Sequence, residues 1–249
     1  MKRLKYKALI FDVDGTLIVN KKDGFPSIKT TIALKKAGKI LHTGIASSRP
    51  YFLLSHIFDH LRLSGPSIIN GGTQIIDLDT GKILWEKLIE KNDFMEICQI
   101  FKKEKIPFFV HDGRTDVYKK QESIQTIYNV VSLELSPFQM NSLLKKLNHL
   151  PNISAQRTPD WKKGREGLLI SHAVATKQYA ILKVAELLKI QTHEIIGVGD
   201  GYNDFPLLMA CGLRVAMGNA VSDLKEIADY IAPSVEEDGL ADVINKFIL

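Results

Sequence analysis

The chain has 249 residues, of which 45% are hydrophobic and 24% are charged, and this balance excludes a disordered protein. No stretch holds the roughly 18 uncharged apolar residues that a membrane span needs, and no cleavable leader follows the basic N-terminus, so we expect a soluble, cytoplasmic protein. The net charge of +5 comes from scattered lysine pairs rather than from one basic stripe. This pattern argues against nucleic acid as a partner.

Short apolar runs alternate with helical periods in the first part of the chain. The sequence predicts a strand over Ala8–Phe11, a helix over Ser27–Ala37, a strand ending near Ala46, a helix over Tyr51–Leu61 and a strand over Ser67–Ile69. The alternation returns near the C-terminus, with expected helices and strands in turn over Thr176–Leu188, Glu194–Gly199, Asp204–Ala210, Arg214–Met217, Ser222–Ala228 and Tyr230–Ala232. Such alternation is typical of an α/β protein with a doubly wound, mostly parallel sheet.

The middle of the chain has a different pattern. Pro107–His111 and Arg114–Tyr118 flank Asp112-Gly113, which predicts a hairpin with a two-residue turn. Helical periods over Phe94–Lys103 and Pro137–Leu147 lie on either side of it. We therefore expect a core domain formed by residues 1–82 and 174–249, with an α+β domain at 83–173 inserted into it.

The first predicted strand ends in Asp12-Val13-Asp14-Gly15-Thr16-Leu17. A calcium loop is excluded, because its glycine belongs at the sixth position and here comes fourth. A capped turn explains Asp14 but leaves Asp12 as an unpaired charge at the mouth of a buried strand, which costs solvation free energy. In open α/β sheets that edge is where ligands bind.

A second acidic cluster follows the predicted strand Glu194–Gly199. It contains Asp200, Asn203 and Asp204. If the strands that carry Asp12 and Asp200 are neighbours, their carboxylates share a hard divalent cation, and oxygen ligation favours Mg²⁺. The sequence therefore predicts a metal site at this edge of the sheet.

These stretches together resemble the first and fourth motifs of the haloacid dehalogenase (HAD) superfamily of phosphohydrolases. Asn70–Asp77, Val215–Ala220 and Glu237-Asp238-Gly239 further resemble the Cof-type subgroup, in which a cap is inserted after the third core strand. The resemblance implies a HAD-like Rossmannoid core with an inserted α+β cap. It also implies a Mg²⁺-dependent phosphatase that acts on a small phosphorylated metabolite, such as a sugar phosphate or a similar phosphomonoester.

The resemblance assigns roles to the acidic residues. Asp12 is the expected nucleophile, which forms an aspartyl-phosphate. Asp14 is the expected acid and base, which protonates the leaving oxygen and then activates water. Mg²⁺ is expected between Asp12, the backbone carbonyl of Asp14, and Asp200, with Asn203 and Asp204 supporting it directly or through other groups.

Phosphate binding and charge pairing need further residues. The subgroup has Thr-Gly-Arg after its second core strand, and Ser47-Ser48-Arg49 stands there in this chain, in preference to the nearby Thr43-Gly44. The motif order places the lysine that pairs with nucleophile and phosphoryl group at Lys177. The further candidates for binding phosphate or substrate are Asn70, Gly71 and Asn203.

Two alternatives stay open: a phosphomutase or phosphotransferase of the same fold, and a non-catalytic protein that binds a phosphorylated ligand. On the cap side, scattered cations and one aromatic residue are weak candidates for substrate contact, namely Arg114, Trp161, Lys162, Lys163 and Arg165. The histidines show no ligand spacing, so we expect them to pack rather than to bind metal. We expect a monomer or a weak homodimer.

Overall fold

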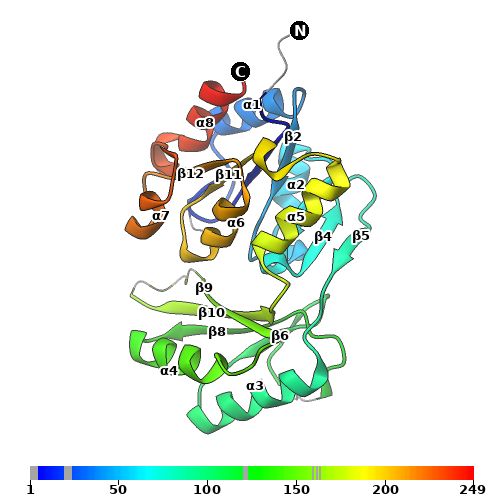
Figure 1. Ribbon diagram of the computed structural model, residues 1–249, viewed down its shortest axis with the longest axis vertical. Coiled ribbons are helices and arrows are strands. Elements are labelled where there is room, and N and C mark those ends of the chain that lie inside the picture. Colours follow the sequence, from blue (N-terminus) through cyan, green and yellow to red (C-terminus); the bar gives the residue numbers. More distant parts are fainter. Residues whose placement is uncertain (1–4, 20–23, 120–122, 159, 161, 163) are drawn as a thin grey trace. The chain divides into compact units, whose positions relative to one another are not determined.

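The computed structural model describes residues 5–19, 24–119, 123–158, 160, 162 and 164–249. The chain forms two compact units (Figure 1). Unit 1 comprises Met1–Trp85 and Lys177–Leu249, and unit 2 comprises Glu86–Thr176.

The described part of unit 1 has a five-stranded parallel sheet in the order β13-β12-β11-β1-β2. Its strands are β1 (Ala8–Phe11), β2 (His42–Ile45), β11 (Ile195–Gly199), β12 (Leu213–Ala216) and β13 (Tyr230–Ile231). The two central strands, β1 and β11, are buried along their whole length, as expected for a parallel sheet covered on both faces. Phe11 lies in register with Val198 on one side and with Ile45 on the other, so the three strands end at one edge.

Helices cover both faces of this sheet (Figure 1). They are α1 (Ile28–Ala37), α2 (Ser55–Leu61), α5 (Lys177–Leu188), α6 (Phe205–Ala210), α7 (Ser222–Glu226) and α8 (Gly239–Phe247). Side chains of β1 alternate between two cores, because Phe11 packs with α1, α2 and α8, whereas Ile10 packs with α5, α6 and α7. None of the helices in the described segments has the length and the apolar character needed to cross a bilayer.

Unit 1 differs from the sequence prediction in three places. The helix predicted over Tyr51–Leu61 is wrong as one element, because Leu54, with a φ of −115°, separates the 3-10 turn η1 (Tyr51–Leu53) from α2. The helix α8 was not predicted. An antiparallel sheet was also missed, formed by β3 (Pro66–Ile69), β4 (Gln74–Asp77) and β5 (Ile83–Glu86).

In unit 2 the described residues form a second five-stranded sheet, in the order β7-β6-β8-β10-β9, with antiparallel pairing. The strands are β6 (Phe109–His111), β7 (Asp116–Val117), β8 (Asn129–Leu135), β9 (Ile153–Thr158) and β10 (Glu166–His172). Two helices, α3 (Lys91–Glu104) and α4 (Pro137–Leu147), contribute Phe94, Phe101 and Met140 to the core of the unit. The expected fold class, a doubly wound core with an α+β cap, is confirmed.

The hairpin of unit 2 has a longer loop than the sequence predicted. Val110 pairs with Val117 and His111 pairs with Asp116, so residues 112–115 connect the strands. The prediction of a two-residue Asp-Gly turn is therefore wrong. The reason is the side chain of Asp112, whose Oδ1 accepts hydrogen bonds from the backbone N–H groups of Arg114 and Thr115, both at 2.9 Å. An aspartate that caps its own loop in this way stabilises a wider turn.

Candidate active site

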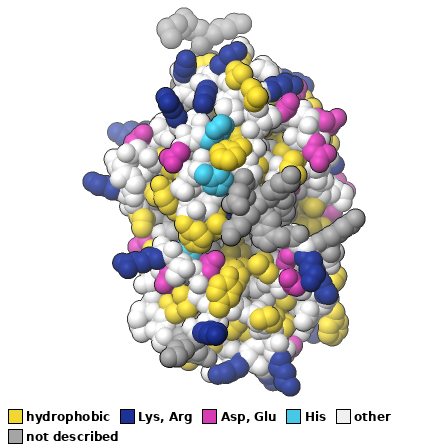
Figure 2. All heavy atoms as spheres, turned by 180° about the vertical axis from the view of Figure 1, so that it is seen from behind, with side chains coloured by type: hydrophobic (Ala, Val, Ile, Leu, Met, Phe, Trp, Pro, Cys, Tyr) yellow, Lys and Arg dark blue, Asp and Glu magenta, His cyan; other side chains and the backbone are white. Residues whose placement is uncertain are grey.

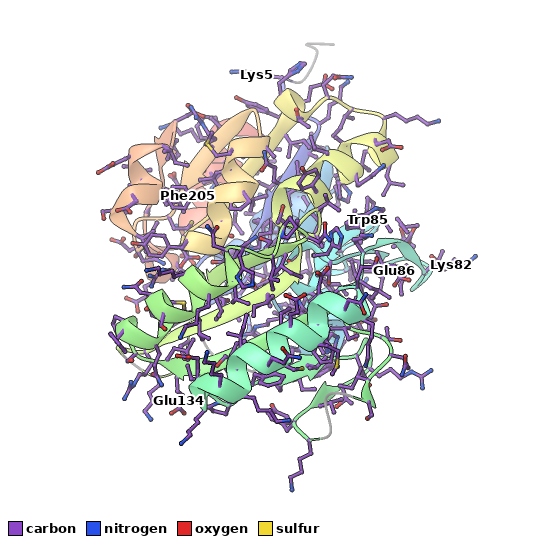
Figure 3. All side chains as sticks on the ribbon, turned by 60° about the horizontal axis from the view of Figure 1, so that its bottom comes forward. Lys5, Lys82, Trp85, Glu86, Glu134 and Phe205 are labelled. Atoms are coloured by element: carbon purple, nitrogen blue, oxygen red, sulfur yellow. The ribbon has the colours of Figure 1, made fainter. Side chains whose placement is uncertain are left out.

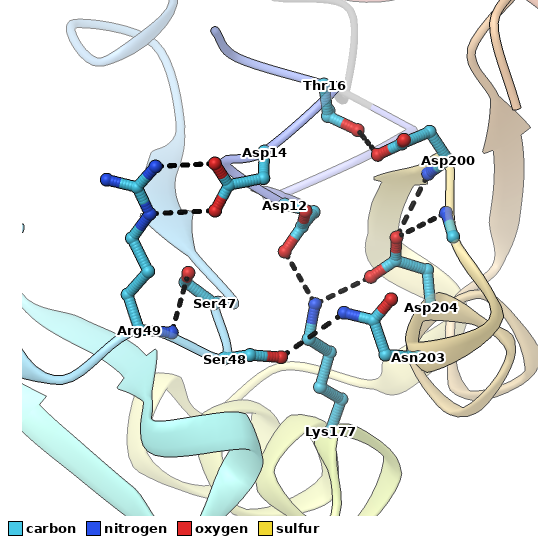
Figure 4. A network of polar contacts seen from close by, with 11 residues as sticks. Asp12, Asp14, Thr16, Ser47, Ser48, Arg49, Lys177, Asp200, Asn203 and Asp204 are labelled. Atoms are coloured by element: carbon cyan, nitrogen blue, oxygen red, sulfur yellow. Dashed lines mark hydrogen bonds and ion pairs between the residues drawn. The ribbon is translucent and has the colours of Figure 1, made fainter. Parts of the chain in front are cut away.

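Three segments that are far apart in the sequence meet at the carboxyl edge of the parallel sheet in unit 1 (Figure 4). Asp12 follows β1, Ser47 comes soon after β2, and Asp200 follows β11. The hydrogen bonding between β1 and β11 extends to Asp12, because its backbone N–H donates to the carbonyl of Val198 at 3.0 Å. The register of the sheet thus brings the predicted site residues together.

Lys177 is the first residue of α5 and is only 1% exposed. Its Nζ donates to Oδ1 of Asp12 and to Oδ1 of Asp204, both at 2.6 Å. Burial alone lowers the pKa of Lys177, but the two carboxylates outweigh it and hold this pKa above the ordinary value. The ammonium group therefore stays charged between the two aspartates.

Carboxylate groups of Asp12, Asp200 and Asp204 offer oxygens that lie within 4.8 Å of one another. Burial, together with repulsion from Asp204, raises the pKa of Asp12 to about 7 in spite of Lys177. Burial and the same repulsion also raise the pKa of Asp200 well above its ordinary value. One lysine does not neutralise three clustered carboxylates, of which Asp12 and Asp204 are buried and Asp200 is half-buried, so the cluster has the charge and the oxygen donors that suit a hard divalent cation.

Asp204 also shapes the loop that carries the cluster. Its Oδ2 accepts hydrogen bonds from the backbone N–H groups of Asp200 and Gly201, both at 3.0 Å. A second contact comes from the first motif, where Oγ1 of Thr16 donates to Oδ1 of Asp200 at 2.9 Å. The loop after β11 is therefore held from both sides.

Asn203 carries a buried polar atom with no partner. Its Nδ2 donates to Oγ of Ser48 at 3.3 Å, whereas its Oδ1 has no hydrogen bond among the described residues. A buried amide oxygen without a partner is costly, and such atoms in native proteins usually meet a ligand, an ion or water. Asn203 lies beside Asp204 (Figure 4), and its Oδ1 faces Gly201, where a Cβ would come within 2.5 Å of it.

Asp14 points to Arg49 rather than to the acidic cluster (Figure 4). Nε and Nη2 of Arg49 donate to its two carboxylate oxygens at 2.7 and 2.5 Å. The next residue, Gly15, has a φ of +81°, and a Cβ there would collide with the carboxylate of Asp200. Only glycine fits this close approach of the two loops. The carbonyl of Gly15 accepts a hydrogen bond from Nδ2 of Asn219 at 2.8 Å.

The loop that contains Ser47 and Ser48 is hydrogen-bonded to the segment after β3. The carbonyl oxygens of Ser47 and Arg49 accept hydrogen bonds from the backbone N–H groups of Gly71 at 2.9 Å and Asn70 at 3.0 Å. Oγ of Ser47 accepts from the N–H of Arg49 at 3.1 Å, which closes the turn locally. The side chain of Asn70 donates to Gln74. The phosphate-binding roles of these residues stay predictions.

A family model for haloacid dehalogenase-like hydrolases matches residues 9–127 and 111–244 of the chain. The chain belongs to the haloacid dehalogenase-like hydrolase family. It is 26% identical over 293 residues to the 5-amino-6-(5-phospho-D-ribitylamino)uracil phosphatase of Bacillus subtilis, and the match covers 97% of this chain and 98% of the relative. The membership of the HAD superfamily and of its Cof-type subgroup that the motifs predicted is confirmed, and the chain is a hydrolase of this family.

Solved structures show the same fold for this HAD-like hydrolase. A superfamily phosphatase from Bacteroides thetaiotaomicron superposes with a TM-score of 0.83 at 22% identity, covering 97% of this chain and 95% of the other. A HAD subclass IIB sugar phosphatase superposes with a TM-score of 0.81 at 21% identity, covering 97% of this chain and 98% of the other.

Unit 2 of the HAD-like hydrolase carries the weak cap candidates. Trp161 and Lys163 lie outside the described residues. Lys162 is exposed and its Nζ forms an ion pair with Glu134 at 2.8 Å (Figure 3 labels Glu134), which is an ordinary surface contact. Arg114 and Arg165 are also exposed. Roles of these side chains in substrate contact stay predictions.

Three contacts of the site were not anticipated from the sequence. Thr16 and Asn219 stand inside stretches that carried the resemblance, yet neither was assigned a role, although both hold loops of the site. The pairing of Arg49 with Asp14 was also missed, because Arg49 was expected to bind phosphate or substrate. A hydroxyl residue two positions after the motif aspartate Asp14 is the signal that could have identified Thr16.

Proposed function

We propose that this HAD-like hydrolase is a Mg²⁺-dependent phosphatase that hydrolyses a small phosphorylated metabolite through an aspartyl-phosphate on Asp12. The observation that carries the proposal is the position of Asp12, which is buried at the carboxyl end of β1 and shares Lys177 with Asp204. The phosphorylated ribitylamino group named for the Bacillus subtilis relative and the sugar phosphatase among the structural neighbours support a polyol or sugar phosphate as the substrate.

In the first step, a carboxylate oxygen of Asp12 attacks phosphorus, and the bond between phosphorus and the leaving oxygen breaks. Asp14 transfers a proton to that oxygen, so the leaving group departs as an alcohol. Lys177 keeps Asp12 oriented and places positive charge near the phosphoryl oxygens. Ser47 and Ser48 supply hydroxyl and backbone N–H donors at the end of β2.

In the second step, Asp14 removes a proton from water, which attacks the phosphorus of the aspartyl-phosphate. The P–O bond to Asp12 breaks, inorganic phosphate leaves, and the carboxylate of Asp12 is restored. This order of events requires Asp14 to be protonated for the first step and deprotonated for the second. Its ion pair with Arg49 holds the carboxylate in one orientation while Asp14 is deprotonated, between the first and the second step.

Asp12, Asp200 and Asp204 would hold Mg²⁺, with the backbone carbonyl of Asp14 and the side chain of Asn203 as further oxygen donors. When bound, the ion supplies positive charge between the nucleophile and the dianionic phosphoryl group. The acidic cluster and the unpartnered Oδ1 of Asn203 fit such an ion. A monomer or weak homodimer without a nucleic-acid partner stays a prediction.

Phosphate release from an aryl phosphate such as p-nitrophenyl phosphate, with Mg²⁺ and with EDTA, tests the proposal. Asp12→Asn is expected to lose activity by about three orders of magnitude or more, because it removes the nucleophile. Asp59→Asn, which changes an exposed aspartate on α2, is the matched control and keeps full activity. The proposal fails if the native protein is no faster than Asp12→Asn on a broad panel of phosphomonoesters. Formation of an isomeric phosphate with little free phosphate would indicate a mutase instead.

A further inference from the structure

A cavity of about 400 Å³ opens in unit 1 at the amino end of β2. It lies where α1 and α2 end, and the first residues of β2 form its floor. The candidate active site lies beyond the opposite end of the same strand, where Ser47 and Arg49 follow. The cavity is therefore separate from the acidic cluster, and nothing in the proposed reaction uses it.

The floor of the cavity carries a polar group that protein contacts leave unused. Thr43 is only 6% exposed and lines the cavity, and its hydroxyl makes no hydrogen bond among the described residues. A hydroxyl both donates and accepts, and Oγ1 of Thr43 is not among the fully buried polar atoms, so it can bond with water or with a ligand in the cavity. A ligand that reaches the floor of the cavity would satisfy it.

His42 adds an acceptor, not a charge, beside Thr43. Its Nε2 lies 3.0 Å from the carbonyl oxygen of Pro66, and because a carbonyl only accepts, Nε2 carries the proton. Burial lowers the pKa of His42, which favours this neutral ring. Its Nδ1 is then an acceptor.

The rim of the cavity is positively charged. Lys35, Lys39 and Arg62 are exposed residues that line it, and no acidic residue does. Within the described parts of the chain, none of the three cations forms an ion pair. Lys and Arg side chains also gather at the upper end of unit 1 on the face shown in Figure 2. An anion at the rim would therefore meet three cations that form no ion pair among the described residues, although the carboxylate of Asp79, which accepts from the N–H of Gly65, acts on His42.

The dipole of α1 explains only part of this charge. A lysine in the last turn of a helix is stabilised by the partial negative charge there, which accounts for Lys35 and equally for Lys36, which does not line the cavity. Lys39 and Arg62 follow the ends of their helices. The walls between rim and floor are apolar and include the buried Leu34, Leu41 and Leu61.

We propose that this cavity binds a small organic anion, a carboxylate or phosphoryl group attached to an apolar body. The anionic group lies against Lys35, Lys39 and Arg62, and the apolar body lies between the leucines. A polar atom of the ligand reaches the hydroxyl of Thr43. The volume lies within the range of small-molecule sites.

Titration calorimetry with benzoate and with phenylphosphonate tests the proposal on the native protein. At least one probe is expected to bind with a Kd of about 1 mM or tighter. Thr43→Val keeps the shape of the side chain and removes the hydroxyl, and Lys39→Met removes one cation. Each change is expected to weaken binding about fivefold or more. Binding of benzoate alone identifies a carboxylate ligand, and binding of phenylphosphonate alone identifies a phosphoryl ligand.

Two further variants make the test specific. Lys36→Met removes a neighbouring exposed lysine of the same helix that does not line the cavity, and the Kd is expected to stay unchanged. Gly38→Ala is compatible with its φ of −63°, and its Cβ would lie 3.3 Å from Oγ1 of Thr43, so the added methyl group covers the hydroxyl and weakens binding.

The proposal is overturned if neither probe saturates the protein by about 20 mM. It is also overturned if Thr43→Val and Lys39→Met leave the Kd unchanged, because the binding then belongs elsewhere, including the candidate active site. Thermal denaturation and aryl phosphate hydrolysis of each variant show that it is folded. None of these substitutions touches the candidate active site, so unchanged activity is expected.

Discussion

Arg49 binds both carboxylate oxygens of Asp14 through two parallel hydrogen bonds, Nε to Oδ2 at 2.7 Å and Nη2 to Oδ1 at 2.5 Å. The side chains are 4% and 14% exposed, so solvent competes little for either partner. A two-point contact between guanidinium and carboxylate fixes orientation as well as distance. Arg49 is therefore placed to position the residue for which we propose the acid and base role.

Arg49→Lys is expected to lower kcat about tenfold or more while changing KM less, because lysine keeps the charge but loses the planar fork that orients Asp14. Steady-state hydrolysis of an aryl phosphate measures both constants. Arg214→Lys is a matched control, because Arg214 makes a similar two-point pair with Asp229 on the surface. A rise in KM with unchanged kcat would show instead that Arg49 binds the substrate.

Asp200→Asn is expected to stabilise the protein in EDTA at pH 8 and to abolish stabilisation by Mg²⁺. Burial and two neighbouring carboxylates oppose the charge of Asp200, so its removal relieves repulsion by about 1 kcal/mol, or about 2–4 °C in Tm. The asparagine can still accept the hydrogen bond from Thr16. Thermal denaturation with EDTA and with MgCl₂ measures both effects.

Asp59→Asn provides the comparison for that experiment, since it removes an exposed charge and should change neither Tm value. A lower Tm of Asp200→Asn in EDTA would mean that the carboxylate stabilises the cluster without an ion. Retention of the full Mg²⁺ effect would place the ion elsewhere.

The contribution of Asp12 to the stability of the metal-free protein is expected to fall as the pH rises from about 4 to about 7. The pKa of Asp12 is raised from 3.8 to about 7 in the folded protein, so between these values the native state binds a proton that the unfolded chain has released. Raising the pH removes this proton and therefore removes stability. Mg²⁺ has the opposite dependence, because it binds the deprotonated carboxylates and becomes more stabilising as the pH rises.

Urea denaturation of the native protein and of Asp12→Asn in EDTA, at several pH values, isolates this contribution. The free energy of unfolding of the native protein should fall relative to that of Asp12→Asn as the pH rises from 4 to 7. A difference that stays constant with pH would show that Asp12 does not titrate in this range.

Gly15→Ala is expected to destabilise the protein and to reduce hydrolysis at least about tenfold, because the added Cβ meets the carboxylate of Asp200 in a loop of the site. Gly81→Ala is the matched control. Gly81 has a φ of +69° and nothing within 4 Å of its Cβ position, so this change costs only the backbone strain of about 1 kcal/mol. Urea denaturation and phosphate release compare the two.

Equal destabilisation by the two substitutions, with activity retained in both, would show that the approach of Gly15 to Asp200 has no consequence for catalysis. We expect Gly15→Ala to lose more activity than its loss of stability relative to Gly81→Ala explains. The reason is that Gly15 lies in the loop of Asp14, at the point where this loop approaches Asp200.

The sequence was most informative where local chemistry decides the structure. The strand at Ala8–Phe11 and the helix at Pro137–Leu147 were predicted with the bounds that the structure has, because their apolar periods and flanking polar residues are local signals. The acidic residues Asp12 and Asp200 were recognised for the same reason, since each directly ends a buried strand. Helix α8 was missed. The two-residue turn predicted after His111 was wrong, because a four-residue loop connects the two strands there.

The sequence by itself determined the local elements and predicted which residues bring chemistry to this protein. These are the aspartates at the ends of two strands and, from the resemblance, the lysine at the start of α5 and the serine pair after β2. Only the tertiary structure decided how they pair. Arg49 reaches Asp14 across 35 positions and Thr16 reaches Asp200 across 184, and both contacts depend on β1 lying between β2 and β11. No local period encodes the order of strands in a sheet, because that order follows from how the whole core packs.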